Sequence, residues 1–379
     1  MTPGARLSAA IEVIADIEAR RRPAADALKD WGLVHRFAGS ADRAAIAGLV
    51  YDTLRRRASS AHIMGDQRPR AAVLGMLRLE RKLDCDAIAA RADGGRFAPP
   101  PLSAEERARL AAADLAGAPP WVAGDYPQWL DPHLARVFGE ERIAEGEALA
   151  SRAPLDLRVN GLKAEPEAAR DALAHLNAVP TRWSPVGLRI ALAAVMENRG
   201  QLYATDSDKR RLAPIHERLE RAGVHNVQVR TPRARENLLA DLENRADLVL
   251  IDAPCTGIGT WRRNPDAKWR VRPGALELRL EEQIDALDRA AVLVKPGGRI
   301  AYVTCSVLAE ENGDQVRAFL ARQPDFALVP VDVANALGER AYLFRRAALT
   351  SEEGLLMTPR RTDTDGFYVA LLVRRGRAA

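Results

Sequence analysis

The chain has 379 residues, 47% of them hydrophobic and 28% charged, which is typical of a soluble globular protein with two or three domains. Its net charge of +5 permits a nucleic-acid partner without requiring one. None of the three cysteines forms a Cys-x-x-Cys pair, which argues against a disulfide scaffold or a zinc site. We therefore expect no metal and a reduced, cytoplasmic setting. No segment approaches the ~18 consecutive apolar residues of a membrane span, so we expect no membrane contact, and a monomer.

Residues 1–95 are predicted to form an all-helical domain. Leu7, Ile11 and Ile14, for example, recur at the spacing of one helical face. Three arginines at 55–57 close a later helix, where cations suit the C-terminal end of the helix dipole. These arginines are either solvated there or in contact with RNA.

A linker and a small mixed unit are expected next. Residues 96–121 are predicted to be a linker, because the consecutive prolines at 99–101 cannot enter a helix. Residues 122–190 are predicted to form a small α+β unit. In this unit the alternation over 155–160 indicates a strand, and 165–176 should form a helix.

Residues 191–379 alternate between apolar strands and helices, which predicts an α/β fold with a doubly wound parallel sheet. The main expected strands are 200–206, 226–229, 248–251, 299–304 and 366–373, with helices over 209–222 and 275–294. Asp206 ends the first of these strands, where a carboxylate commonly accepts the ribose hydroxyls of a nucleotide-like cofactor. An acid at that place is as often a helix N-cap.

Two cysteines follow apolar runs, each just past the carboxyl end of a predicted strand. Cys255 stands in DAPCTGIG and Cys305 in YVTCS. Ligands collect at that edge of open α/β sheets, so we expect the two thiols to meet in one site and act on one substrate. A helix N-terminus after Cys305 would lower the pKa of its thiol, whereas the acids Glu310 and Glu311 would oppose this.

Three stretches together resemble the RNA cytosine-C5 methyltransferases of the Nol/Nop/Sun type, and especially the bacterial RsmB/Fmu enzymes of small-subunit rRNA. They are DAPCTGIGTWRRNPDAKW, YVTCS and TDTDGFYVALLV. Residues 1–95 resemble the NusB-like RNA-binding domain of these enzymes, and APLDLRVNGLK resembles their small pre-catalytic subdomain. The resemblance covers nearly the whole chain. It implies a Rossmann-like methyltransferase sheet over 191–379, S-adenosylmethionine as cofactor and 16S rRNA as partner.

The resemblance also implies a role for each candidate residue. C5 of cytosine is a poor nucleophile until a thiolate adds at C6. By family pattern Cys305 is that nucleophile, and Cys255 helps to break the adduct after methyl transfer. Asp252 would hold either the cytosine edge or the amino-acid end of the cofactor, and Asp206 the cofactor's ribose. The basic residues that would neutralise RNA phosphates are Arg262, Arg263, Lys268 and Arg270.

The sequence departs from this family pattern ahead of the strand at 200–206. The family's Gly-rich cofactor loop, of the form Asp-x-Cys-Ala-x-Pro-Gly-Gly-Lys-Thr, has no counterpart. A join near Ile190/Ala191 would have removed the end of the subdomain, the central first strand and this loop. The cofactor affinity should then fall. The strands on either side would stay unpaired, unless residues 186–190 pair in the vacant place.

Three interpretations follow. The first is an RNA 5-methylcytosine methyltransferase, and the second a cofactor-impaired homologue that retains only RNA binding. The third is a different cysteine enzyme, such as an acyl-transfer hydrolase, which the lack of a histidine motif beside either cysteine disfavours. The strand at 226–229 also ends without a clear acid to contact adenine.

Overall fold

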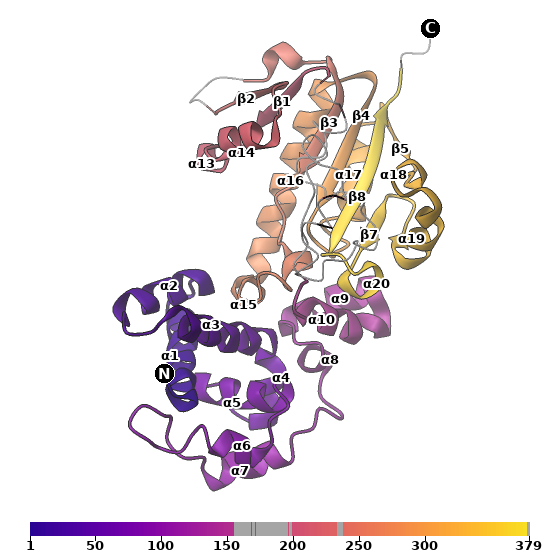
Figure 1. Ribbon diagram of the computed structural model, residues 1–379. Coiled ribbons are helices and arrows are strands. Elements are labelled where there is room, and N and C mark those ends of the chain that lie inside the picture. Colours follow the sequence, from indigo (N-terminus) through magenta and orange to yellow (C-terminus); the bar gives the residue numbers. More distant parts are fainter. Residues whose placement is uncertain (155–167, 169–170, 172–195, 197–198, 233–237, 377–379) are drawn as a thin grey trace.

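The computed structural model describes residues 1–154, 168, 171, 196, 199–232 and 238–376. A helical body is followed along the chain by an α/β body, as Figure 1 shows. Several predictions lie outside the described residues: the strand at 155–160, the helix at 165–176, pairing by 186–190 and the join near Ile190/Ala191. Among the helices that the structure describes, none is both long and apolar enough to cross a membrane.

The N-terminal region is all-helical, as predicted. Its helices are α1 (Pro3–Arg20), α2 (Ala24–Val34), α3 (Ser40–Arg55), α4 (Arg57–Met64), α5 (Pro69–Leu79) and α6 (Cys85–Ala89). Thr2 is the N-cap of the first helix, because its hydroxyl accepts the Ala5 N–H at 3.1 Å. Leu7 and Ile14, from the predicted apolar face, are fully buried in the core of this body.

The predicted linker at 96–121 contains a helix. Ser103 and Glu106 form a reciprocal capping box that starts α7 (Ala104–Ala111), and Leu110 on this helix is buried in the helical core. The prolines at 99–101 stay outside helices as expected. Much of the linker therefore packs as part of the helical body. The capping box starts a helix after the prolines, and the buried Leu110 holds that helix against the helical core.

Short helices connect the two bodies. They are α8 (Pro120–Ala123), α9 (Asp131–Phe138) and α10 (Arg142–Ala150), with 3-10 turns at Gln128–Leu130 and Gly139–Glu141. Leu134, Phe138 and Leu149 are buried in the same core as the main sheet. Figure 1 shows α9 and α10 beside α20 (Pro359–Thr362) at the lower end of that sheet.

The main sheet has six strands in the order β3-β4-β8-β7-β6, with β5 also paired to β8. The strands are β3 (Ala246–Asp252), β4 (Val294–Thr304), β5 (Phe326–Val329), β6 (Leu349–Thr350), β7 (Leu355–Met357) and β8 (Phe367–Arg374). Only β3 and β4 are parallel neighbours among these pairs. The sheet is thus mixed and not wholly parallel as predicted, because the last strand enters antiparallel beside β4.

The helices of the α/β body flank this sheet. The long helix α16 (Pro273–Leu293) joins β3 to β4, and α17 (Gly313–Arg322) follows β4 (Figure 1). Leu287 and Ala290 of α16 are buried against the sheet, together with Ile300 and Tyr302 of β4. The smaller elements are α15 (Ala267–Arg270), α18 (Ala334–Leu337), α19 (Ala341–Ala347) and 3-10 turns at Ala240–Leu242, Ile258–Thr260 and Gly338–Arg340.

A second sheet contains only β1 (Leu202–Thr205) and β2 (Val227–Arg230), which are parallel. The predicted helix between them is divided into α13 (Lys209–Leu212) and α14 (Ile215–Ala222), because Pro214 has no N–H to continue the first. In the part of the chain that the structure describes, neither strand pairs with β3. The absence of a strand between β1 and β3 stays a prediction, because the join near Ile190/Ala191 lies outside the described residues.

Candidate functional site

The two predicted thiols lie together. Cys255 follows β3 and Cys305 follows β4, and these strands are paired in parallel up to Asp252 and Val303. Neighbouring parallel strands end at one edge, so the sulfur atoms approach to 3.2 Å. The two thiols therefore meet at one edge of the sheet, as expected, and that they act on one substrate stays a prediction.

The two thiols have pKa values shifted in opposite directions. The hydrogen bond between the two sulfurs lowers the pKa of Cys305, because Cys255 can donate it to an ionised Cys305, while burial and the charge of Asp252 oppose the shift. The pKa of Cys255 is raised, because the same hydrogen bond favours its protonated form and burial disfavours its thiolate. The pair can therefore hold a thiolate on Cys305, stabilised by the protonated Cys255.

A buried glutamate ties the two cysteine loops together. Glu311 is fully buried, and its carboxylate accepts the Thr256 N–H at 2.7 Å and the Thr256 hydroxyl at 2.5 Å. It also accepts a hydrogen bond from Gln283 Nε2 at 3.2 Å. Burial raises its pKa, whereas hydrogen bonds from Ser306 and Thr256 act in the opposite direction. Thr256 follows Cys255 and Ser306 follows Cys305, so this side chain fixes the spacing of the thiols.

The sequence did not reveal this role of Glu311. It appeared there only as an acid close to Cys305 along the chain, with no signal that it would turn inward. Asn312 and Thr304 also hold the Cys305 loop through hydrogen bonds. Thr304 donates to Asn312 Oδ1 at 2.6 Å, and Asn312 Nδ2 donates to the Ser306 carbonyl at 3.1 Å.

Truncating the glutamate should loosen the thiol pair. Glu311→Ala leaves the partly buried Thr256 N–H and the buried Gln283 amide without this acceptor, so we expect a loss of about 1–3 kcal/mol in unfolding free energy. Glu311→Gln keeps one acceptor oxygen and should lose less. The sensitive measurement is the rate at which hydrogen peroxide joins the Cys255 and Cys305 thiols as a disulfide, followed by thiol titration. An unchanged rate in folded Glu311→Ala protein would contradict this positioning role.

The third family segment meets the cysteine loops at Gly259. The Gly259 N–H donates to the Cys305 carbonyl at 2.9 Å, and the Gly259 carbonyl accepts the Gly366 N–H at 2.8 Å. Gly366 opens β8, the strand of the segment TDTDGFYVALLV. The three stretches that carry the family resemblance therefore come into contact at one point of the backbone.

The two candidate aspartates lie on different sheets. Asp252 is the last residue of β3, is exposed, and is close enough to affect the pKa of Cys305. Asp206 follows β1 in the two-stranded sheet, and its carboxylate accepts the Asp208 N–H at 2.8 Å. The alternative considered for Asp206, a helix N-cap, is wrong, because Asp208 caps α13 and Asp206 lies two residues before it. The part of Asp206 in cofactor binding stays a prediction.

Two of the four predicted RNA contacts are buried. Arg262 is 2% exposed and donates to Asp365 at 2.5 Å, and Lys268 is 1% exposed and donates to the Arg55 carbonyl at 3.1 Å. Neither cation is on the surface, so the prediction that they neutralise RNA phosphates is wrong. Both side chains form their hydrogen bonds inside the protein, because the segment that contains them packs against the helical body.

The other two predicted contacts remain accessible. The side chains of Arg263 and Arg270 are 39% and 36% exposed. Arg263 forms an ion pair with Asp365, and Arg270 with Asp266, the latter at 2.9 Å. The carboxylate side chains of both pairs are only 10% exposed, so an arginine that turned to another anion would leave a buried charge without this partner.

Lys268 belongs to a buried polar contact between the two bodies. Its neighbour Asp125 is fully buried and accepts the Ser59 N–H at 2.9 Å and the Ser59 hydroxyl at 2.7 Å. Trp269 Nε1 donates to the Leu54 carbonyl at 2.7 Å in the same interface. Burial lowers the pKa of Lys268 to about 7, although the charge of Asp125 opposes the shift.

Stability should depend on pH through Lys268. Its pKa is about 7 in the folded protein and about 10.5 in the unfolded chain. Between these values the unfolded chain binds the proton more tightly, so stability rises with pH, by at most about 1.4 kcal/mol per unit. Urea unfolding of the wild type and of Lys268→Met at pH 7, 8 and 9 isolates this contribution, because the variant lacks it. A stability difference that is constant with pH would exclude it.

Two family models match the chain. One, described as 16S rRNA methyltransferase RsmB/F, matches residues 184–373. The other, a ferredoxin-like domain of RsmF/B-like methyltransferases, matches residues 126–196. The first covers both cysteine loops and the C-terminal strand.

Curated relatives match over the α/β body. The chain is 31% identical to the probable ribosomal RNA small subunit methyltransferase B of Bacillus subtilis over 193 residues, which are 51% of this chain and 42% of that protein. It is 34% identical to ribosomal RNA small subunit methyltransferase B of Cronobacter sakazakii over 178 residues, or 47% of this chain and 37% of that one. The aligned region thus spans less than half the length of these relatives.

Solved structures support the fold. The crystal structure of PH0851 covers 99% of this chain and 99% of its own, with a TM-score of 0.69 and 23% identity. A methyltransferase homologue from Pyrococcus horikoshii has a TM-score of 0.52 and 21% identity, over 68% of this chain and 97% of that one. The fold is therefore that of Rossmann-like methyltransferases, preceded by helices.

Proposed function

Because the chain belongs to the RsmB/F family of 16S rRNA methyltransferases, we propose that it transfers a methyl group from S-adenosylmethionine to C5 of a cytosine in small-subunit rRNA. Such a substrate is consistent with a cytoplasmic enzyme. We further propose that the helical body is a NusB-like RNA-binding domain, with boundaries near those predicted from the sequence.

The observation that carries this proposal is the pair of thiols 3.2 Å apart at the ends of β3 and β4. Methylation at C5 needs a nucleophile on the neighbouring carbon, and the lowered pKa of Cys305 suits that role. Its sulfur forms a bond to C6, and the electron pair of the C5=C6 double bond makes C5 nucleophilic.

The second thiol suits the release of the product. Once Cys305 is bonded to C6, the thiol of Cys255 no longer faces a thiolate and can itself lose its proton to solvent. After C5 has been methylated, the C5 proton passes to the Cys255 sulfur, the C–H electron pair restores the C5=C6 bond, and the C6–S bond breaks so that Cys305 departs as a thiolate. Cys255 contacts the sulfur that departs, which places it to assist this step. Asp252, beside the pair, would hold the polar edge of the cytosine. Among the described residues no histidine bonds to either thiol, which disfavours the acyl-transfer hydrolase.

The described residues supply only part of a binding site for S-adenosylmethionine. When bound, this cofactor supplies the methyl group. Asp206 and Asp252 stand at strand ends where they would hold its ribose and its amino-acid end. The glycine-rich backbone that would receive it is not found in the described ranges. On β3, Leu248 and Leu250 are 45% and 49% exposed, and β3 is not paired with β1 there. The exposed side chains of β3, and its lack of pairing with β1 among the described residues, favour a second candidate function. This is a cofactor-impaired homologue that retains RNA binding.

One experiment separates the two candidates. The purified chain is incubated with a 16S rRNA transcript and S-adenosylmethionine, and the digested RNA is examined for 5-methylcytidine by mass spectrometry. Calorimetric titration with the cofactor is run in parallel. Submillimolar cofactor binding together with 5-methylcytidine supports the enzyme. RNA binding with neither supports the impaired homologue, and a methylated base other than 5-methylcytidine contradicts the proposed chemistry.

A further inference from the structure

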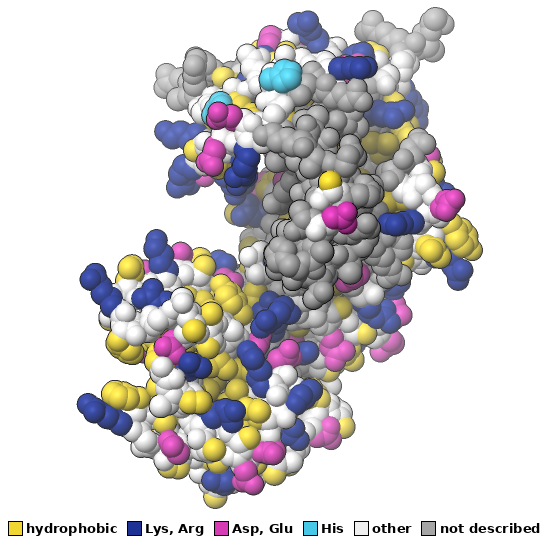
Figure 2. Space-filling view, viewed as in Figure 1, with side chains coloured by type: hydrophobic (Ala, Val, Ile, Leu, Met, Phe, Trp, Pro, Cys, Tyr) yellow, Lys and Arg dark blue, Asp and Glu magenta, His cyan; other side chains and the backbone are white. Residues whose placement is uncertain are grey.

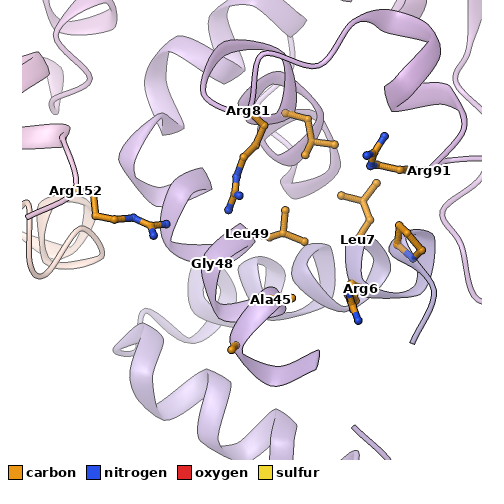
Figure 3. A pocket seen from close by; sticks show the side chains of 11 residues that line it. Arg6, Leu7, Ala45, Gly48, Leu49, Arg81, Arg91 and Arg152 are labelled. Atoms are coloured by element: carbon orange, nitrogen blue, oxygen red, sulfur yellow. The ribbon is translucent and has the colours of Figure 1, made fainter. Parts of the chain in front are cut away.

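A pocket in the helical body is not used by the proposed reaction. It has a volume of about 360 Å³ and lies among α1, α3 and the ends of α5 and α6 (Figure 3). Its charged lining residues are all arginines, namely Arg6, Arg81, Arg91 and Arg152. Figure 3 shows Arg152 and Arg91 on opposite sides of the pocket, with Leu49 and Leu7 between them. A cavity of this size falls within the range of ligand sites in proteins.

Two aspartates hold three of these arginines in place. Asp52 is 3% exposed and forms ion pairs with Arg81 at 2.5 Å and Arg152 at 3.1 Å. Asp42 pairs with Arg6 at 2.8 Å. Guanidinium groups that are already oriented lose less conformational entropy when they bind an anion. The ion pairs therefore hold these guanidinium groups in a fixed orientation, which favours the binding of an anion more than a cluster of freely moving arginines would.

The arginines outnumber the carboxylates. In the ranges that the structure describes, Arg91 donates to the Ala87 carbonyl and pairs with no carboxylate. The side chains of Arg81 and Arg152 are 41% and 66% exposed, so their outer N–H groups are within reach of a ligand. Positive charge thus remains after the ion pairs have formed, and it surrounds an apolar lining that includes Leu49.

We propose that this pocket binds a phosphodiester segment of RNA, an inference that rests on the proposed function. Guanidinium groups bind phosphate oxygens through paired hydrogen bonds, and the leucines offer an apolar surface to the adjoining ribose or base. Arg152 lies two residues after the end of α10, which packs with the α/β body, so an RNA strand held here would contact both bodies. Figure 2 shows Lys and Arg side chains among hydrophobic and acidic ones over the helical body, so the pocket, and not the whole face, is the proposed contact.

Gly48 allows a test that removes no arginine. It lies in α3 and lines the pocket, and a Cβ there would approach only Arg81, at 3.4 Å. Gly48→Glu would place a carboxylate among the arginines, whereas Gly48→Gln would add a similar volume without charge. Both residues favour a helix more than glycine does, so the fold should be retained. Arg68→Gln, at a site 84% exposed in the same body, is the control for a general loss of charge.

Binding of a labelled 16S rRNA transcript is measured without cofactor at several salt concentrations. We expect Gly48→Glu to bind at least about tenfold more weakly than Gly48→Gln, with a salt dependence lower by about one phosphate contact. Gly48→Gln and Arg68→Gln should stay near the wild type. Equal RNA binding by Gly48→Glu and Gly48→Gln would overturn the proposal.

Two further measurements separate this proposal from its alternatives. Inorganic phosphate that binds the wild type but not Gly48→Glu, with RNA binding unchanged, would show a site for a free anion and overturn the RNA assignment. In methyl transfer, Gly48→Glu should raise KM for the transcript and leave kcat near that of Gly48→Gln. A wild type that binds RNA through the pocket but transfers no methyl group would refute the proposed function and leave this inference standing.

Discussion

The Cys255→Ala variant should become covalently joined to 16S rRNA, whereas the Cys305→Ala variant should form no adduct. Both should lose methyl transfer by at least about a thousandfold, because each removes one of two groups that act as a unit. The difference lies in the step that fails. Without Cys305 no bond to C6 forms, and without Cys255 the bond forms and is not broken. Denaturing gel electrophoresis of protein incubated with transcript and S-adenosylmethionine distinguishes the two outcomes.

The same variants test whether the hydrogen bond between the two thiols lowers the pKa of Cys305. Removing Cys255 removes the hydrogen bond that lowers the pKa of Cys305, so the alkylation of Cys305 by iodoacetamide should need a higher pH. Cys85→Ala is the matched control, because Cys85 lies in the helical body, away from the thiol pair. An adduct that persists in the Cys305→Ala protein would reverse the two assignments.

Gly259→Ala should be among the most destabilising single substitutions in the α/β body. A Cβ at Gly259 would lie 2.1 Å from the Gly366 carbonyl oxygen and 2.6 Å from its carbonyl carbon. These are backbone atoms at the start of β8 and cannot turn aside as a side chain would. We expect a loss of about 3 kcal/mol or more in unfolding free energy, measured by urea denaturation. Because Gly259 also donates to the Cys305 carbonyl, the thiol pair should separate as well.

A second glycine serves as the control for Gly259. Gly274 lies in the first turn of α16, where a Cβ would meet nothing within 4 Å. Alanine there should stabilise the protein by about 0.5–1 kcal/mol, because it restricts the unfolded chain without a clash. A Gly259→Ala protein as stable as Gly274→Ala would mean that the loop and β8 are not packed as closely as described.

Local sequence signals predicted the strands that bring the two thiols together. The apolar runs before Cys255 and Cys305 were sufficient to place both cysteines at strand ends, and the thiols do meet there. Local signals failed where side chains turn inward. Arg262 and Lys268 stand in a basic, loop-like segment and looked like surface residues, yet both are buried against partners far away in the sequence.

The sequence alone thus determined the two strands that end at the thiols and the helical nature of the first 95 residues, because periodicity and turn residues act over short distances. Only the tertiary structure decided the rest. It showed that Glu311 sets the spacing of the cysteine loops, that Gly259 joins the three family segments, and that arginines from four separate segments line one pocket. Each of these depends on contacts between residues distant in the chain, which no local pattern records.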